Sequence, residues 1–321
     1  MSKPAPRVPS ARPVQLGALI ALILLGSASY AYAQAPQPQP QPQLAWPAAG
    51  EAAIEVEGIG HLSVSGGSQS VPIASVAKVM TAYLTLRHHP LRPGRDGFTL
   101  TVTAADAQDE QQRAALGESV LPVRVGERLS ERQALQALML PSANNVAQML
   151  AAHEAPTVAA FVARMNATAR RLGMTETIYT DPSGYSASTV STAADQLRLA
   201  AVVMRRSVFA QIVDESSAVL PVAGIVSNYN QLVGHDGYVG IKTGSDSAAG
   251  GCLVFAKRVE IGGRRLTILG DVLDQREGSL IPAALNAGRR LGDSAAVALR
   301  DGVLVPPGTA AFVGRRLARL L

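Results

Sequence analysis

The sequence predicts an α+β fold, in which one antiparallel sheet is assembled from distant segments, flanked by helices and joined to a helical lobe. Three observations support this class. Strand-like patterns occupy both ends of the folded part, helical patterns fill its middle, and no internal repeat is visible. The chain has 321 residues, of which 47% are hydrophobic, and this is enough to build one sizeable core.

Strands are expected where apolar and polar residues alternate between glycine-rich turns. Towards the N-terminal side, the Gly58–Gly60 turn joins two short strands. Towards the C-terminal side, two strands form a hairpin over Gly262 and Gly263. The segments expected to be strands are residues 52–58, 60–66, 98–106, 237–244, 251–260 and 264–274.

Helices are expected where apolar residues recur with helical spacing. Ser130 and Thr192 are typical N-caps, while Pro141 and Gly173 are typical helix ends. The first helix carries Lys78 and should end before residue 88. The segments expected to be helices are residues 71–87, 129–140, 145–154, 157–173, 191–206 and 279–299.

Residues 1–33 are predicted to be an export leader. Lys3, Arg7 and Arg12 precede an apolar run that ends in an Ala-x-Ala pattern at residues 31–33, and this order is typical of a secretory signal peptide. The run can be extended to the minimum length of a membrane span, so an uncleaved N-terminal membrane anchor is the alternative. Either reading places the folded part outside the cytoplasm, secreted or anchored to the outer face of the cytoplasmic membrane.

The leader is followed by a spacer of alternating proline and glutamine, residues 34–43. This composition favours an extended, solvated chain rather than a helix or a strand. The single folded domain is expected at residues 44–300. Residues 301–321 are expected to be a C-terminal tail, whose arginine-rich apolar end could also bind weakly to a membrane surface.

Composition argues against several classes of function. Lys and Arg total 29 against 24 Asp and Glu, but the basic runs lack interleaved aromatic residues, so nucleic-acid binding is not expected. Cys252 is the only cysteine, which excludes an internal disulfide. The five histidines show no ligand spacing, so neither a metal site nor a cofactor is expected.

Lys78 is the residue that first suggests a chemical role. It lies among apolar residues of a predicted core helix, where burial disfavours its charged form. Ser75 precedes it by three residues, and on a helix these two side chains share a face. A neutral lysine amine can take the proton of a serine hydroxyl and so make it nucleophilic. The alternative is a lysine that extends along the helix surface into solvent.

Two further stretches favour the catalytic interpretation of Lys78 over that of a lysine extending into solvent. Ser142 and Asn144 project from a short turn after a helix and a proline, where a hydroxyl and an amide can relay a proton and hold a substrate amide. Lys242, Thr243 and Gly244 end a predicted strand, where a cation and a hydroxyl suit an anionic group and glycine permits close approach. Taken singly, each stretch could be an ordinary polar loop or edge strand.

The order Ser-x-x-Lys, Ser-x-Asn and Lys-Thr-Gly is specific when all three occur together. Ser142 follows Ser75 by 67 positions and precedes Lys242 by 100. With these motifs, and with stretches such as "LMLPSANNVAQML" and "GIKTGSDSAAGGCLVFA", the sequence resembles the serine-type D-alanyl-D-alanine carboxypeptidases, the low-molecular-mass penicillin-binding proteins. The resemblance implies a fold like that of β-lactamases and transpeptidases.

The resemblance also implies roles for the motif residues. Ser75 would attack the carbonyl between two D-alanines of a peptidoglycan stem peptide, and Lys78 would take its proton. Backbone N–H groups of Ser75 and Ser245 would form the oxyanion hole. Ser142 would pass a proton to the leaving D-alanine. The residues expected to bind substrate are Asn144, Lys242, Thr243, Gly244 and Ser245, and the catalytic residues are Ser75, Lys78 and Ser142.

Several partners and alternatives follow from the resemblance. Peptidoglycan stem peptides are the implied substrates, in cell-wall biogenesis, and β-lactam antibiotics the implied inhibitors. A D,D-endopeptidase that cuts crosslinks would use the same residues. A class A β-lactamase would need a glutamate that activates water, and Glu176 is the nearest candidate. An inactive wall-binding homologue is a further alternative. Asp246 departs from the threonine common in relatives, and its carboxylate is expected to point outward.

Overall fold

The computed structural model describes residues 44–58, 61–67 and 69–302. Contacts divide the chain into a unit of residues 1–39 and a unit of residues 40–321, and all described residues belong to the second unit. The predicted leader at residues 1–33, the spacer at residues 34–43 and nearly all of the tail lie outside the described residues. Within the described ranges, no helix combines the length and apolar character needed to cross a membrane.

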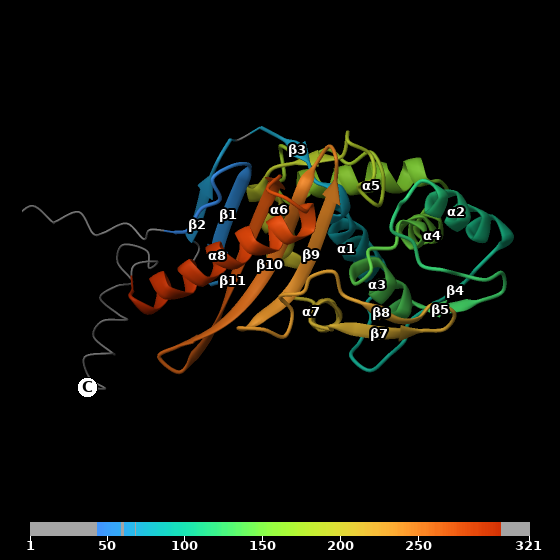
Figure 1. Cartoon of the computed structure of the whole chain (residues 1–321). Helices are drawn as coiled ribbons and strands as arrows, with labels where there is room; N and C mark the ends of the chain where they lie inside the picture. Colours follow the sequence, from blue (N-terminus) through green and yellow to red (C-terminus); the bar gives the residue numbers. More distant parts are fainter. Residues whose placement is uncertain (1–43, 59–60, 68, 303–321) are drawn as a thin grey trace, which may run out of the picture. The chain divides into compact units, whose positions relative to one another are not determined.

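The second unit is built on a five-stranded antiparallel sheet, with strand order β2-β1-β11-β10-β9 (Figure 1). The two ends of the domain therefore meet in the middle of the sheet, because β1 pairs with β11. This confirms the prediction of one sheet assembled from distant segments. The five strands are β1 (Glu51–Val56), β2 (His61–Ser65), β9 (Tyr238–Asp246), β10 (Gly250–Ile261) and β11 (Arg264–Gln275).

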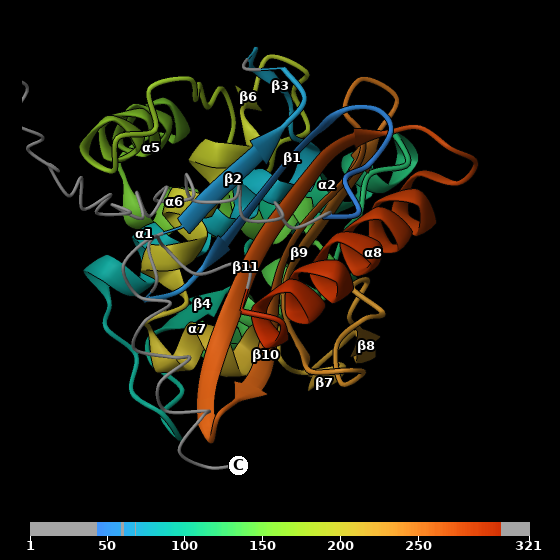
Figure 2. The same cartoon turned by 90° about the vertical axis from the view of Figure 1, so that its left-hand side faces the viewer.

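Helix α8 (Leu280–Arg300) covers one face of the sheet, and α6 (Ala193–Val203) packs on the opposite face (Figure 2). The alternation of the strands gives each face its own apolar core. Leu253 and Phe255 of β10 pack with α8, whereas Cys252 and Val254 of the same strand belong to the core on the other face. Lys242 pairs with Val254, so it lies on the face that is turned away from α8.

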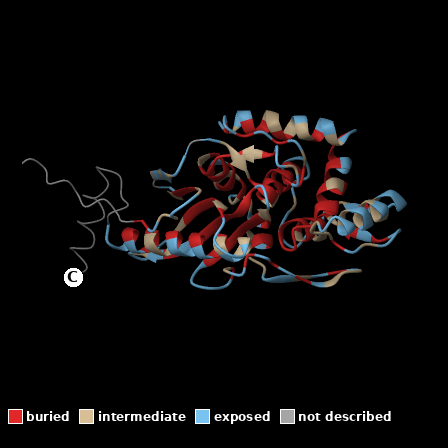
Figure 3. Cartoon of the chain, turned by 45° about the horizontal axis from the view of Figure 1, so that its top comes forward, coloured by how far each residue is buried: buried red, intermediate tan, exposed pale blue. Residues whose placement is uncertain are grey.

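The helical lobe is formed by the middle of the chain. It consists of α1 (Lys78–His88), α2 (Ala104–Ala115), α3 (Glu131–Met139), α4 (Asn144–Glu154), α5 (Val158–Arg171) and α7 (Ser207–Val213), with a 3-10 helix η1 (Ala74–Ala77) before α1. Helix α1 is buried along most of its length and contacts α3, α4, α5 and α6. Figure 3 shows that α1 and the sheet form the interior, whereas α5 and α2 expose an outer side.

Three two-stranded pairs complete the domain, and they account for the main differences from the predicted elements. They are β3 (Val71–Pro72) with β6 (Val190–Ser191), β4 (Thr99–Thr101) with β5 (Arg128–Ser130), and β7 (Ser217–Leu220) with β8 (Gly224–Ser227).

The expected strand at residues 98–106 is wrong beyond its first part. The strand ends at Thr101, and Thr103 caps α2 by accepting a hydrogen bond from Asp106 N–H. The first helix also differs at both ends, since α1 begins at Lys78 after a 3-10 turn and includes His88. The α+β class itself is as predicted.

Candidate active site

Ser75 lies in η1, directly before the helix that carries Lys78. The turn is set by Ala74, whose φ is 44°, and by Gly184, where an added Cβ would lie 1.8 Å from the Ala74 carbonyl oxygen. Lys78 Nζ is 2.8 Å from Ser75 Oγ and donates a second hydrogen bond of 3.0 Å to the Ser183 carbonyl. Lys78 is fully buried, whereas Ser75 is partly exposed. A substrate can therefore reach the hydroxyl but not the amine.

Burial lowers the pKa of Lys78 well below the usual value for lysine, and the positive charge of Lys242 lowers it further. The carboxylates of Asp181 and Glu118 act in the opposite direction. The net direction favours a neutral amine. A neutral amine beside a hydroxyl is the arrangement that the Ser-x-x-Lys spacing predicts.

The loop after Tyr179 supplies a second hydrogen-bond partner of Lys78, which no motif in the sequence indicates. Asp181 accepts hydrogen bonds from the backbone N–H groups of Ser183, Gly184 and Ser186, which closes the loop into a rigid turn. The Ser183 carbonyl is thereby aimed at Lys78. The signal in the sequence was the run of turn-forming residues after an aspartate, which predicts a turn but not its partner.

Ser142 and Asn144 lie between α3 and α4. Ser142 has a φ of 67° and is buried, and within the described part of the chain its hydroxyl has no hydrogen-bond partner. Asn144 begins α4, and its side-chain Nδ2 donates to Glu118 Oε2 at 2.7 Å. Its Oδ1 atom is buried and likewise lacks a partner among the described residues. The turn therefore holds one hydroxyl and one amide oxygen that protein groups do not satisfy.

The Lys-Thr-Gly motif lies on β9, which forms one edge of the sheet. An added Cβ at Gly244 would lie 3.1 Å from Ser75 N, so the strand passes directly beside the proposed nucleophile. Lys242 is buried and donates to the Thr243 carbonyl at 2.9 Å, and burial lowers the pKa of its amine to about 7. The edge of β9 and the start of α1 are thus brought together, as the motifs predict.

A family model described as D-alanyl-D-alanine carboxypeptidase matches residues 61–270 of the chain, a range that contains all three motifs. The chain belongs to this family of serine peptidases. The predicted relationship is therefore confirmed. The penicillin-binding, transpeptidase-like fold of the domain is confirmed with it.

The family membership agrees with individual relatives. The chain is 35% identical over 214 residues to a D-alanyl-D-alanine carboxypeptidase of Mycobacterium tuberculosis, covering 64% of this chain and 68% of that protein. It is 33% identical to a D-alanyl-D-alanine endopeptidase of Pseudomonas aeruginosa, covering 47% of this chain and 46% of that protein. The chain thus spans less than half of that endopeptidase.

The fold is similar to that of the Streptomyces K15 DD-transpeptidase, with a TM-score of 0.67 and 26% sequence identity. The structural match covers 79% of this chain and 98% of the transpeptidase chain. The match therefore extends over nearly the whole of that domain rather than over the motifs alone.

Asp246 follows the motif and is held by its own turn. Its Oδ1 atom accepts hydrogen bonds from Ala248 N and Ala249 N at 2.8 and 2.7 Å. Arg276 donates to the carbonyls of Ser247 and Ala248 in the same turn. The carboxylate is thus engaged in closing the turn between β9 and β10, and the arginine adds a positive charge beside the end of β9.

Glu176, the candidate for a β-lactamase-type water activation, is exposed. Within the described ranges, no cluster of His, Cys, Asp and Glu has the makeup of a metal site.

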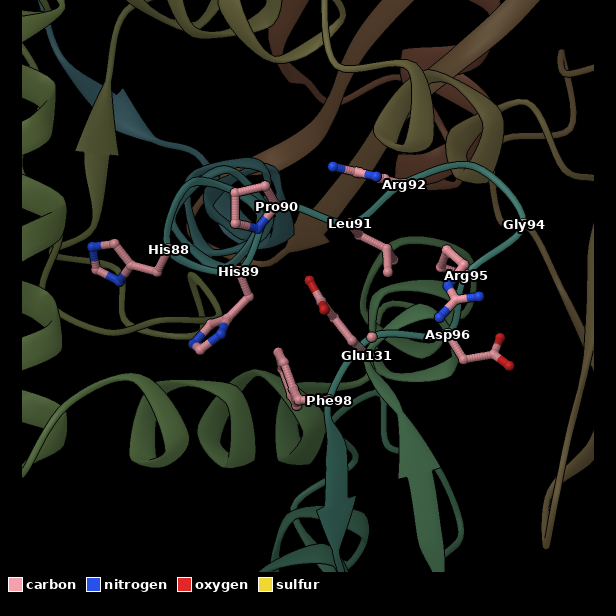
Figure 4. Close-up of a pocket in the computed structure, with 11 residues that line it drawn as sticks. His88, His89, Pro90, Leu91, Arg92, Gly94, Arg95, Asp96, Phe98 and Glu131 are labelled. Carbon is pink, nitrogen blue, oxygen red and sulfur yellow. The ribbon is translucent and has the colours of Figure 1, made fainter.

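A separate hollow lies at the far end of α1 and is lined by His88, His89, Phe98 and Glu131, among others (Figure 4). Helix α1 has 11 residues, which places the hollow about 16 Å along the helix axis from Lys78. The hollow is therefore outside the site that the motifs form.

Proposed function

We propose that the chain is a serine D,D-carboxypeptidase that removes the terminal D-alanine from peptidoglycan stem peptides through an acyl-enzyme at Ser75. The observation that carries the proposal is the 2.8 Å contact between Lys78 Nζ and Ser75 Oγ at the edge of β9. Family membership supports the reaction class, since the matching model is described as a D-alanyl-D-alanine carboxypeptidase.

The acylation step begins with proton transfer. Lys78, neutral before the reaction, accepts the Ser75 proton while Ser75 Oγ attacks the carbonyl carbon between the two D-alanines. The oxyanion that forms is stabilised by the backbone N–H groups of Ser75 and Ser245. The C–N bond then breaks, and the leaving amine of D-alanine receives a proton through Ser142.

Substrate is positioned by the remaining motif residues. Asn144 holds the peptide group on the acyl side, while Lys242 and Thr243 bind the terminal carboxylate. Gly244 lets β9 run directly beside Ser75, and β9 is an edge strand, so an extended peptide can pair with it. Water then attacks the ester, which releases the shortened stem peptide and restores the Ser75 hydroxyl.

A D,D-endopeptidase is the second candidate, because a relative with 33% identity bears that name. Both reactions cleave a peptide bond at the same kind of D-alanine carbonyl. They differ in whether the leaving amine belongs to free D-alanine or to a crosslinked peptide.

We further propose that the enzyme acts outside the cytoplasm as a domain of residues 44–300. Residues 1–33 would export or anchor it and residues 34–43 would act as a spacer. Membrane association through the leader or the tail is part of this proposal. β-Lactams would acylate Ser75, because they present a reactive carbonyl to the same nucleophile.

The decisive experiment measures D-alanine release from a stem pentapeptide and cleavage of a crosslinked dimer, with Ser75→Ala as the control. Release from the pentapeptide supports the carboxypeptidase, and cleavage of the dimer alone supports the endopeptidase. A fluorescent penicillin should label the wild-type protein covalently and leave Ser75→Ala unlabelled. A wild-type protein that neither labels nor cleaves either peptide would rule out the proposed function.

A further inference from the structure

Glu118 connects the segment after α2 to the Ser-x-Asn turn. The side chain of Glu118 is only 3% exposed, and its Oε2 atom accepts from Arg113 Nη1 at 2.9 Å and from Asn144 Nδ2 at 2.7 Å. The backbone N–H of Asn144 donates to the Ser119 carbonyl at 2.7 Å. The side chain of Asn144 is therefore tied to Glu118 and its main chain to the next residue, Ser119.

The contact with Glu118 determines which way the Asn144 amide faces. A carboxylate paired with a guanidinium only accepts hydrogen bonds, so the amide atom beside it must be the nitrogen. The Oδ1 atom then faces away, where it is buried and, among the described residues, has no partner. One N–H of Nδ2 also remains for another acceptor. The amide thus presents a fixed donor and a fixed acceptor to the site.

We propose that Glu118 is a positioning residue that locks the Asn144 amide in the orientation that recognises the substrate peptide group. The inference rests on the proposed function, which assigns that recognition to Asn144. Without the carboxylate, the amide can rotate by half a turn, which exchanges its donor and its acceptor at almost no steric cost. The substrate carbonyl would then face an oxygen in part of the molecules.

Glu118 also acts on Lys78, the proposed base, through its charge. Its carboxylate raises the pKa of Lys78, whereas Arg113 lowers it. Replacing Glu118 by a neutral residue removes its raising effect, while the lowering effect of Arg113 stays. The pKa of Lys78 therefore falls further, so the amine becomes neutral at a lower pH. This gives a measurement that a purely structural role of Glu118 would not affect.

The test is Glu118→Gln, which keeps the size of the side chain but can pair with the Asn144 amide in either orientation. We expect KM for D-alanine release from the pentapeptide to rise about tenfold, with a much smaller change in kcat. We also expect the acid limb of the acylation rate, followed with a fluorescent penicillin, to move to lower pH. A KM within twofold of the wild-type value, together with an acid limb at the wild-type pH, would overturn the inference.

Two further variants separate the hydrogen bond from the charge. Glu118→Asp keeps the charge but shortens the side chain, so KM should rise while the acid limb stays at the wild-type pH. An unchanged KM in this variant contradicts the proposal, even where Glu118→Gln does not fold. Glu110→Gln is the matched control on α2, because its carboxylate contacts neither Arg113 nor Asn144. An equal rise in KM in Glu110→Gln would mean that the loss of a negative charge alone causes the effect, and it would overturn the inference.

A double-mutant cycle tests whether Glu118 acts through Asn144. In an Asn144→Ala background, Glu118→Gln should raise KM no further, while the shift of the acid limb should remain. A full additional tenfold rise in KM would contradict the proposal. The outcomes also separate the two hypotheses: an inactive wild-type protein overturns the proposed function, whereas an active one with unchanged Glu118 variants overturns this inference alone.

Discussion

Lys78 and Lys242 can perform their proposed tasks only in different protonation states. Lys78 must be neutral to accept the Ser75 proton, whereas Lys242 must be charged to bind a carboxylate. Burial and the neighbouring cation lower the pKa of Lys78 well below its usual value, and burial lowers that of Lys242 to about 7. The site therefore favours the state in which one of the two amines is protonated over the state in which both are protonated.

The first prediction concerns the alkaline limb of activity. As pH rises above about 7, Lys242 loses its charge and carboxylate binding weakens, so kcat/KM should fall. In Lys242→Arg the cation persists at all accessible pH values, so the limb should move up by more than about one pH unit. The measurement is the pH profile of D-alanine release. A limb at the same pH in both proteins would exclude Lys242 as its source.

The second prediction concerns Lys78→Met, which replaces the amine by an apolar group of similar length. Acylation by a fluorescent penicillin should slow by about 10²–10⁴-fold, because the proposed general base is lost. The melting temperature should change little, because relief from desolvating the amine offsets the loss of its hydrogen bond to the Ser183 carbonyl. A slowdown together with a large drop in melting temperature would indicate a structural role for Lys78 instead.

Not all residue-scale contacts could be predicted from the sequence. The pair Ser75 and Lys78 follows from helical spacing, since residues three apart share a face. Glu118 and Asn144 are 26 residues apart, and no spacing rule relates them. Ser183 reaches Lys78 over 105 residues. These two contacts depend on how the lobe folds, which the local pattern does not contain.

At the scale of elements, the loop of residues 181–189 packs against the turn that carries Ser75, the proposed nucleophile. Gly184 packs on the Ala74 carbonyl, and the Ser183 carbonyl accepts a hydrogen bond from Lys78. The loop and η1 therefore form one unit. A displacement of the loop should disturb the Ser75 hydroxyl, although the loop itself contains no motif residue.

The third prediction is that Gly184→Ala lowers both stability and acylation. The new Cβ would lie 1.8 Å from the Ala74 oxygen, and Gly184 has a φ of 80°, so the loop must move. We expect a loss of about 1–3 kcal/mol in the free energy of unfolding and a slower reaction with a fluorescent penicillin.

The matched control is Gly173→Ala, where φ is 74° but no atom lies within 4 Å of the added Cβ. This variant carries the same backbone strain without the clash. It should lose about 1 kcal/mol or less and acylate at the wild-type rate. Equal acylation rates in the two variants would mean that the loop does not support the site.

The elements missed by sequence analysis share a physical cause. Helix α2 has no fully buried residue, so it lacks the apolar stripe that reveals a helix. The strand expected at residues 98–106 alternates correctly, but its continuation ends where Thr103 forms a capping box with Asp106. The sheet strands were predicted because their residues alternate between glycine-rich turns. Short surface pairs such as β7 and β8 carry no such pattern.

At the scale of the whole domain, an acidic group far from the active site should govern stability at alkaline pH. Glu131 is buried in the hollow at the end of α1, next to Glu154, and burial and that neighbouring charge raise its pKa to about 7. Glu154 itself is held by His88 and His89 at 2.7 and 3.4 Å. Glu131 is therefore protonated at acidic pH and charged at alkaline pH.

The fourth prediction follows from the sign of this shift. The folded state binds the Glu131 proton more tightly than the unfolded state, so stability should decline as pH rises from about 4.5 to about 7. Glu131→Gln should remove this decline and stabilise the protein at pH 8 by about 2 kcal/mol, with little effect at pH 5. Denaturant unfolding at both pH values is the measurement. A variant less stable than wild type at pH 8 would contradict the assignment.

The burial of the lysines has a practical consequence. Lys78, Lys242 and Lys257 are 0%, 1% and 5% exposed, so the described part of the chain presents arginine but almost no primary amine to solvent. Amine-directed dyes and crosslinkers should react slowly with this domain while it is folded. Rapid labelling would then report opening of the core, which offers a simple assay for ligands that keep the domain closed.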